Sequence, residues 1–102
     1  MTGAERLHAE GRKLFAYPFR LYVLDCAEGS TEQVIISVPK KLFKRAVRRN
    51  LIRRRTREAL RHVRAEYADA AGKDILMVYV ANEILEYGKI VEGVRDALAK
   101  IQ

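Results

Sequence analysis

Hydrophobic and polar positions alternate in the first half of the chain, in the pattern of β-strands. In residues 17–24, apolar side chains recur at every second position from Phe19 to Val23, which predicts a strand with two different faces. Residues 33–38 are β-branched at most positions and predict a second strand. Because the turn-forming residues 28–31 separate the two segments, we expect the strands to form a hairpin.

Helical and strand patterns follow each other in the second half of the chain. From about residue 42 the apolar spacing is helical and continues to Tyr67, with Gly72 as a stop signal. Residues 74–81 are nearly all apolar, which predicts a strand in the centre of a sheet. The last segment repeats apolar residues at helical spacing and predicts a final helix. The residues of this apolar stripe are Tyr87, Ile90, Val91, Val94, Leu98 and Ile101.

A short N-terminal helical turn and a candidate strand at residues 12–15 complete the pattern. We therefore expect a single domain over residues 1–102 with an α+β fold. The predicted architecture is an α-β sandwich, in which helices cover one face of a small mixed sheet. The composition, 49% hydrophobic and 32% charged, is that of one compact globular domain.

Three features of the sequence predict a cytoplasmic protein. The single Cys26 has no partner for an internal disulfide, as is usual in a reducing compartment. No apolar run approaches the roughly 18 residues of a membrane span. The first residues lack the uninterrupted apolar core of a signal peptide.

The charge of the chain is concentrated in one segment. Residues 40–64 hold twelve of the twenty Lys and Arg residues and one acid, Glu58, which gives this segment a charge of +11. The rest of the chain has eight bases and twelve acids, a sum of −4, so the net charge of +7 comes from residues 40–64. A cationic helix on a nearly neutral body indicates a polyanionic partner, and nucleic acid is the first candidate.

A helical wheel at about 100° per residue divides the basic helix into two adjacent arcs. One arc is apolar and is expected to pack on the sheet; it consists of Ile52, Thr56, Ala59, Leu60, Val63 and Tyr67. The other is polar and is expected to face solvent; it consists of Asn50, Arg53, Arg54, Arg57, Arg61 and Arg64. Arginine matches phosphate oxygens with two parallel hydrogen bonds. A merely solvated face normally mixes charges of both signs, and this one does not.

The charge alone does not distinguish DNA from RNA. A basic helix can enter the major groove of DNA, whereas RNA binders use phosphate, sugar and exposed-base contacts. The first strand offers Phe19 on one face and Tyr22 on the other, and one of these faces must pack on the helices. Phe19 is in phase with the apolar positions and is expected in the core, whereas Tyr22 is a candidate for stacking an unpaired base on an open sheet face.

The basic segment carries a specific motif. It reads SVPKK at residues 37–41 and, after a short gap, RAVRRNLIRRRTRE at residues 45–58. This run resembles the signature of the bacterial ribonuclease P protein subunit, in which an Arg-Asn pair stands at a fixed distance from further basic residues. Gly11 and Tyr22 resemble the first-strand region of that family, and residues 85–87 resemble the start of its last helix, so the resemblance extends over nearly the whole chain from Gly11 onward.

The resemblance implies a fold and a division of labour. The family fold is an α-β sandwich of the ribosomal protein S5 domain 2 type with a left-handed β-α-β crossover, an exception to the usual right-handed rule. The catalytic RNA subunit of ribonuclease P cleaves precursor tRNA with bound magnesium and releases the 5′ leader, and the protein is an accessory subunit. The implied partners are therefore this RNA and precursor tRNA, and magnesium is bound mainly by the RNA subunit and the substrate.

Residues of this chain take their expected roles from the matching positions. The RNA-binding set combines the motif with the polar arc of the wheel and consists of Lys40, Lys41, Arg45, Arg49, Asn50, Arg53, Arg54, Arg57 and Arg61. Lys13 and Tyr22 are expected to line a cleft for the single-stranded leader at the open sheet face. His8 stands where the family often has an aromatic residue, a departure that bears on this cleft alone.

No pattern in the sequence indicates a catalytic site on the protein itself. His8 and His62 are isolated, and neither metal-ligand spacing nor a nucleophile with an adjacent base is present. We therefore expect no catalytic residue and no metal ligand on this chain. Two other classes remain open: a small protein that binds ribosomal RNA without a role in tRNA maturation, and a DNA-binding regulator that reads a duplex with its helix.

Overall fold

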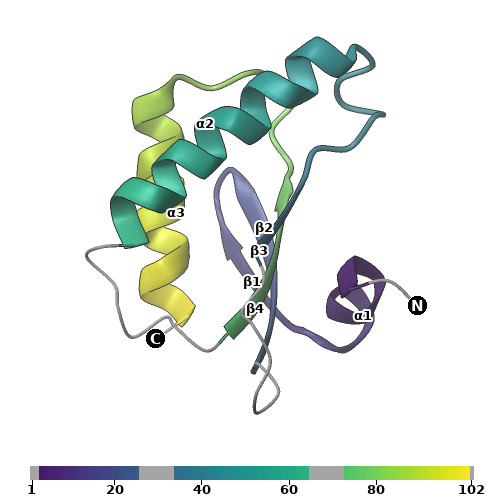
Figure 1. Cartoon of the computed structure of the whole chain (residues 1–102), viewed down its shortest axis with the longest axis vertical. Helices are drawn as coiled ribbons and strands as arrows, with labels where there is room; N and C mark the ends of the chain where they lie inside the picture. The colour runs from purple at the N-terminus through teal and green to yellow at the C-terminus, as the bar shows by residue number, and fades with distance from the viewer. Residues whose placement is uncertain (1–2, 26–33, 65–72, 102) are drawn as a thin grey trace.

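The computed structural model describes residues 3–25, 34–64 and 73–101, which form four strands and three helices (Figure 1). In chain order these are α1 (Gly3–Glu10), β1 (Arg12–Ala16), β2 (Phe19–Asp25), β3 (Val34–Ser37), α2 (Ala46–Arg64), β4 (Lys73–Tyr79) and α3 (Tyr87–Ile101). The α+β fold and the candidate strand at residues 12–15 are therefore confirmed. Cys26, the predicted turn at residues 28–31, Tyr67 and Gly72 lie outside the described residues.

The strands form a mixed sheet in the order β1-β2-β4-β3. β2 runs antiparallel to β1 and to β4, whereas β3 runs parallel to β4. The predicted hairpin between the second and third strands is wrong, because β4 lies between them. Pairing on both sides covers the nearly all-apolar β4, which an edge position would leave half exposed. The hairpin is formed instead by β1 and β2, and α2 makes the β-α-β connection from β3 to β4.

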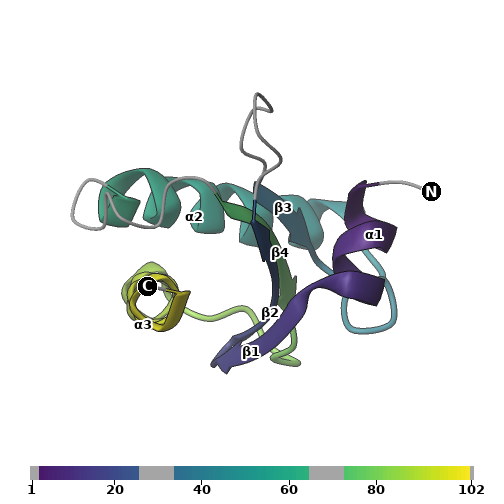
Figure 2. The same cartoon turned by 90° about the horizontal axis from the view of Figure 1, so that it is seen from below.

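Helices α2 and α3 pack on one face of the sheet, as expected, and α1 packs on the other (Figure 2). The core beneath α2 and α3 contains Phe19 and Leu21 of β2 with Met77 and Tyr79 of β4, each at most 1% exposed. Successive residues of a strand face opposite sides. The intervening residues therefore point to α1, where Leu7, Tyr22 and Leu76 form a second, smaller apolar cluster.

The basic segment is not one helix over residues 40–64. After β3 the chain makes a turn in which the amides of Leu42 and Phe43 donate to the carbonyl of Pro39. Phe43 is buried with its ring centroid 6.0 Å from that of Tyr79, which anchors this turn to the core. Helix α2 consequently begins at Ala46, four residues later than predicted. Lys40, Lys41 and Arg45 therefore lie in the preceding turn and not on the helix.

The final helix α3 buries its stripe as predicted at Ile90, Val94, Leu98 and Ile101. Tyr87 is an exception, because it stands at the first turn and is 41% exposed. Gly93 has a packing role in this helix. A Cβ atom at this position would lie 2.5 Å from Cδ of Pro18 and 2.7 Å from the carbonyl oxygen of Tyr17. The absence of a side chain therefore lets α3 approach the turn between β1 and β2.

Candidate nucleic-acid interface

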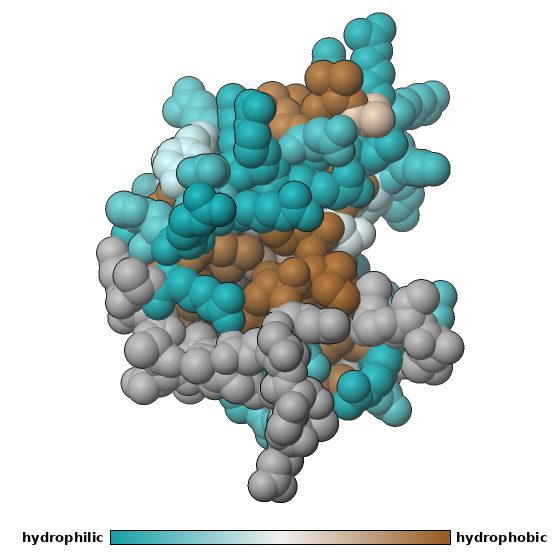
Figure 3. Space-filling view, viewed as in Figure 1, coloured by the Kyte–Doolittle hydropathy of each residue, from teal (hydrophilic) through white to brown (hydrophobic). Residues whose placement is uncertain are grey.

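Helix α2 divides into a buried and an exposed side as the wheel predicts. Ile52, Thr56, Ala59, Leu60 and Val63 are buried against the sheet and α3. The buried Thr56 hydroxyl donates to the carbonyl oxygen of Ile52 at 2.8 Å, so its polar atom has a partner within the helix. On the outer side Asn50, Arg54, Arg57 and Arg61 are exposed. Figure 3 shows this side as a continuous hydrophilic band along α2.

The charge of this exposed side is almost unopposed. By sequence α2 carries eight arginines and one acid, Glu58. The carboxylate of Glu58 lies 3.9 Å from Arg61, and both side chains are more than half exposed, so this pair is weak and solvent-screened. Like charges three and four residues apart repel each other by a few tenths of a kcal/mol per pair in an isolated helix. A bound polyanion would relieve that repulsion.

Asn50 and Arg53 form a pair on the first half of α2. The guanidinium of Arg53 donates to Oδ1 of Asn50 at 3.1 Å. Arg53 is half-buried, whereas Asn50 is exposed. The two side chains therefore present hydrogen-bond donors from one place on the helix, next to the more exposed Arg54 and Arg57.

Arg49 lies at the start of the helix but points back to the preceding turn. Its Nη1 donates to the carbonyl oxygens of Phe43 and Lys44, at 2.8 and 2.9 Å. These bonds hold the turn that carries the exposed Lys40, Lys41 and Arg45. The sequence motif did not indicate this internal use of Arg49, whose contact with RNA stays a prediction.

Arg55 also bonds within the protein. This half-buried side chain donates to the carbonyl oxygen of Leu85 at 2.9 Å, which joins α2 to the segment before α3. The amide of Leu85 donates to the Tyr79 hydroxyl at 3.1 Å, and that hydroxyl donates to the carbonyl oxygen of Glu83 at 2.7 Å. Burial raises the pKa of Tyr79 above its ordinary value, and the hydrogen bond from Leu85 partly opposes that shift. The backbone amide and the backbone carbonyl of Leu85 are thereby both held in place.

The predicted leader cleft lies on the other face of the sheet, where α1 covers part of it. Tyr22 is only 5% exposed, and its ring centroid lies 4.7 Å from that of His8. The expectation that Tyr22 stands on an open face is therefore wrong, because α1 shields one side of the ring. Lys13, directly opposite Tyr22 in the β1–β2 pair, is exposed as predicted.

An open row of side chains lies beside α1 on this face. Phe15 of β1 is 52% exposed and pairs with the exposed Arg20 of β2. A hollow of about 330 Å³ lies next to Arg20. It is lined by Glu5, His8, Arg20, Tyr22, Ser37, Leu76 and Val78. Phe15 and Arg20 were not among the predicted site residues, although their strand alternation with Lys13 and Tyr22 places all four on one face.

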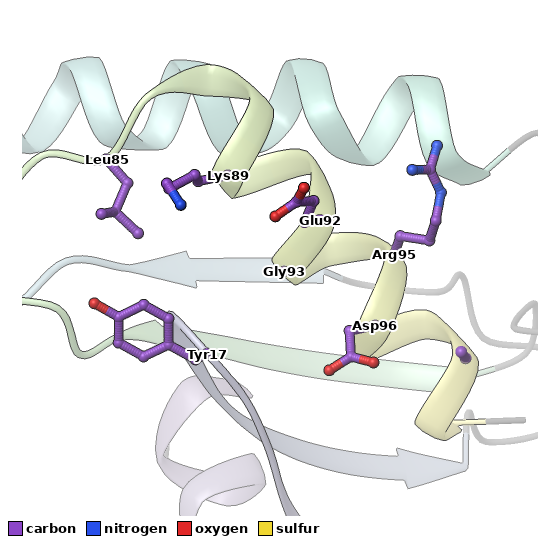
Figure 4. Close-up of a pocket in the computed structure, with 8 residues that line it drawn as sticks. Tyr17, Leu85, Lys89, Glu92, Gly93, Arg95 and Asp96 are labelled. Atoms are coloured by element: carbon purple, nitrogen blue, oxygen red, sulfur yellow. The ribbon is translucent and has the colours of Figure 1, made fainter.

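Another hollow lies between α3 and the turn that contains Tyr17 (Figure 4). It measures about 500 Å³ and is lined by Tyr17, Leu85, Lys89, Glu92, Gly93, Arg95, Asp96 and Ala99. Two bases and two acids line it, in contrast to the arginines of α2. The mixed signs make it a poor site for a polyanion.

The described ranges 3–25, 34–64 and 73–101 contain neither a metal-binding cluster nor a membrane-spanning helix. No group of three or more His, Cys, Asp or Glu side chains there is arranged to hold a metal ion. The helices within these ranges do not have the length and apolar character required to cross a membrane.

Comparisons with known proteins agree with this geometry. The family model described as Ribonuclease P matches residues 5–102. The solved RNase P protein of Staphylococcus aureus is similar, with 25% identity, a TM-score of 0.76, and coverage of 99% of this chain and 91% of the other. The RNase P protein of Thermotoga maritima shares the fold at 21% identity, with a TM-score of 0.80 over the full length of both chains. No curated protein sequence gives a significant match.

The family match extends over almost the whole chain and includes both α2 and the sheet face beneath α1. This chain therefore belongs to the ribonuclease P protein family, whose members are subunits of ribonuclease P and act in processing the 5′ leader of tRNA.

Proposed function

We propose that this chain is the accessory, RNA-binding subunit of ribonuclease P and that the hydrolytic cleavage is catalysed by the RNA subunit. The observation that carries this proposal is the exposed side of α2, where Arg54, Arg57 and Arg61 stand with Glu58 as the one acid of the helix. Such a surface binds phosphates and offers no acid-base pair for chemistry. The protein then contributes binding and positioning.

The RNA subunit is the proposed partner of α2 and of the turn before it. Asn50 and Arg53, joined by their hydrogen bond, together with Arg54, Arg57 and Arg61 form the helical part of this surface. Lys40, Lys41 and Arg45 extend it, and Arg49 holds them in position through the carbonyls of residues 43 and 44. Phosphate contacts of this kind release counterions, so the affinity should fall steeply with salt.

The single-stranded leader of precursor tRNA is the proposed partner of the opposite sheet face. Lys13 and Arg20 supply cations for its phosphates, and the exposed ring of Phe15 supplies a surface on which a base can stack. Tyr22 and His8 form one wall of the hollow rather than an open stacking platform. The two faces of the molecule would thus hold two different RNA segments.

Magnesium is assigned in this proposal to the RNA subunit and to substrate phosphates, since the described residues offer no cluster suited to it. Bound there, the ion would activate a water molecule for the hydrolysis and stabilise the negative charge on the phosphate. The protein's own cations neutralise part of the repulsion between two RNA molecules, a task that extra magnesium performs in their absence.

Cleavage of precursor tRNA by the RNA subunit tests the proposal. Adding the wild-type protein should lower the magnesium concentration needed for half-maximal cleavage, and the rate at saturating RNA and magnesium should change little. A second substrate with a leader of a single nucleotide should gain less from the protein than one with a long leader. If the protein leaves the magnesium requirement unchanged for both substrates, the accessory role is wrong.

A further inference from the structure

An apolar groove lies between α2 and the edge strand β3. It measures about 380 Å³ and is lined by Val34, Ile36, Arg57, Leu60, Arg61 and Arg64. Figure 3 shows apolar surface directly beneath the hydrophilic band of α2. The groove therefore combines an apolar floor with a rim of arginines.

The floor is apolar because β3 stands at the edge of the sheet. Among the described strands β3 pairs with β4 alone. The side chains of Val34 and Ile36 point to the α2 side, where they reach the core but stay half-buried. Leu60, 7% exposed, closes the floor from the helix. When a partner covers half-exposed aliphatic residues, the burial of their apolar surface stabilises the complex.

The rim determines which partner fits. Arg57, Arg61 and Arg64 are four and three residues apart, so they follow one side of α2 over about 10 Å. Among the described residues that line the groove, none is a carboxylate. The occupant must therefore be anionic at its outer edge and flat or apolar where it meets the floor. A base-paired duplex keeps the faces of its bases stacked inside the helix, whereas an unpaired nucleotide offers a phosphate and an exposed base face.

We propose that this groove binds one unpaired nucleotide of the RNA partner. The base lies over Val34 and Ile36 and stacks on a guanidinium plane of the rim, and a rim arginine binds the adjoining phosphate. This inference rests on the proposed function and deepens it. It assigns to one part of the basic surface the ability to distinguish unpaired from paired RNA. An acidic peptide added to β3 is the less favoured occupant, since the rim continues the arginine surface of α2.

The double variant Val34→Thr, Ile36→Thr tests the floor. Threonine keeps the β-branched shape that suits a strand, so the fold should persist. We expect roughly tenfold weaker binding of the RNA subunit, because apolar contact with the base is lost. The slope of log affinity against log salt should stay unchanged, since no phosphate contact is removed. Arg57→Gln should instead make that slope shallower by about 1.

A matched control separates the groove from a general loss of packing. Ile84 and Val91 are also half-buried aliphatic residues packed against the main core, and neither lines the groove. The variant Ile84→Thr, Val91→Thr should therefore bind RNA as the wild type does. Equal affinities of the two double variants would overturn the proposal.

Crosslinking identifies the occupant directly. A photoreactive benzophenone side chain at position 34, in the assembled holoenzyme, should crosslink to a nucleotide that is unpaired in the RNA subunit. A crosslink to a base-paired nucleotide or to a polypeptide overturns the proposal. A wild-type protein that does not bind the RNA subunit at all would be a different result. It would contradict the proposed function and not the groove alone.

Discussion

Helices α2 and α3 lie against each other on the same face of the sheet, yet their solvent sides differ. Each buries an isoleucine completely, Ile52 in α2 and Ile90 in α3, and each contributes several residues to one core. By sequence α2 carries eight arginines and one acid, whereas α3 carries three bases and two acids. The fold requires the apolar stripe of both helices. It does not require the unopposed charge of α2, which works against helix stability and is therefore best explained by a partner.

The hollows beside the two helices show the same difference. The groove at α2 has an arginine rim, while the larger hollow at α3 has Lys89, Glu92, Arg95 and Asp96 together (Figure 4). On α3, Asp96 also forms an ion pair with Lys100, with 3.6 Å between Nζ and Oδ2. Charges on α3 are thus balanced nearby, as on an ordinary solvated helix. Substitutions in α2 and α3 can therefore separate what the two helices share from what only α2 has.

The largest effect should be common to both helices. Ile52→Ala and Ile90→Ala each remove a fully buried side chain and leave a cavity, so each should lower the free energy of unfolding by about 2–5 kcal/mol. Urea unfolding followed by circular dichroism measures both. A loss confined to one helix would show that α2 and α3 do not share the structural role described here.

Removing positive charge should weaken RNA binding only when the substitutions are made in α2. The variant Arg54→Gln, Arg57→Gln should weaken binding of the RNA subunit by about 3 kcal/mol, roughly a hundredfold, and make the salt slope shallower by about 2. Its matched control on α3 is Lys89→Gln, Arg95→Gln, which removes the same charge. Filter binding over a range of salt concentrations should show little change for the control. Equal losses in both variants would mean that net charge matters, and not its position.

The sequence predicted most of what depends on local periodicity. The buried and exposed sides of α2, the stripe of α3 and the central position of β4 all follow from spacing along one segment. The hairpin prediction failed because pairing depends on competition among strands. β4, far away in sequence, is longer than β3 and pairs with β2 along its whole length, so it takes the place beside β2. The start of α2 was placed too early because the buried Phe43 belongs to a turn rather than to the helix.

The site was predicted less completely than the fold. A helical wheel gives the direction in which a side chain leaves the backbone but not where a long side chain ends. The motif assigned Arg49 to RNA binding, although its guanidinium bonds to carbonyl oxygens of the preceding turn. The polar arc of the wheel did not include Arg55, and nothing in the sequence indicated its bond to the Leu85 carbonyl oxygen, 30 residues away. Strand alternation placed Tyr22 on the correct face, but it could not show that α1 covers this face.

Neighbouring arginines of α2 should behave differently. Arg55→Met removes the hydrogen bond to the Leu85 carbonyl and should lower the free energy of unfolding by about 1.5–3 kcal/mol with little effect on RNA affinity. Arg54→Met should do the reverse, because Arg54 is exposed and faces solvent. Thermal unfolding and RNA binding of both variants test the distinction. It fails if the two substitutions change stability and affinity in the same ratio.

The smallest effect should come from the hydroxyl that holds the start of α3. Tyr79→Phe removes the bonds to Leu85 and Glu83 and should lower the free energy of unfolding by about 1 kcal/mol, with RNA affinity unchanged. Burial raises the pKa of Tyr79 above its ordinary value of 10.0, so the folded state favours the neutral phenol. The stabilisation is therefore complete below pH 10 and decreases as the pH rises above it. Unfolding of both proteins between about pH 8 and pH 11 measures this, and a difference that grows with alkaline pH would contradict it.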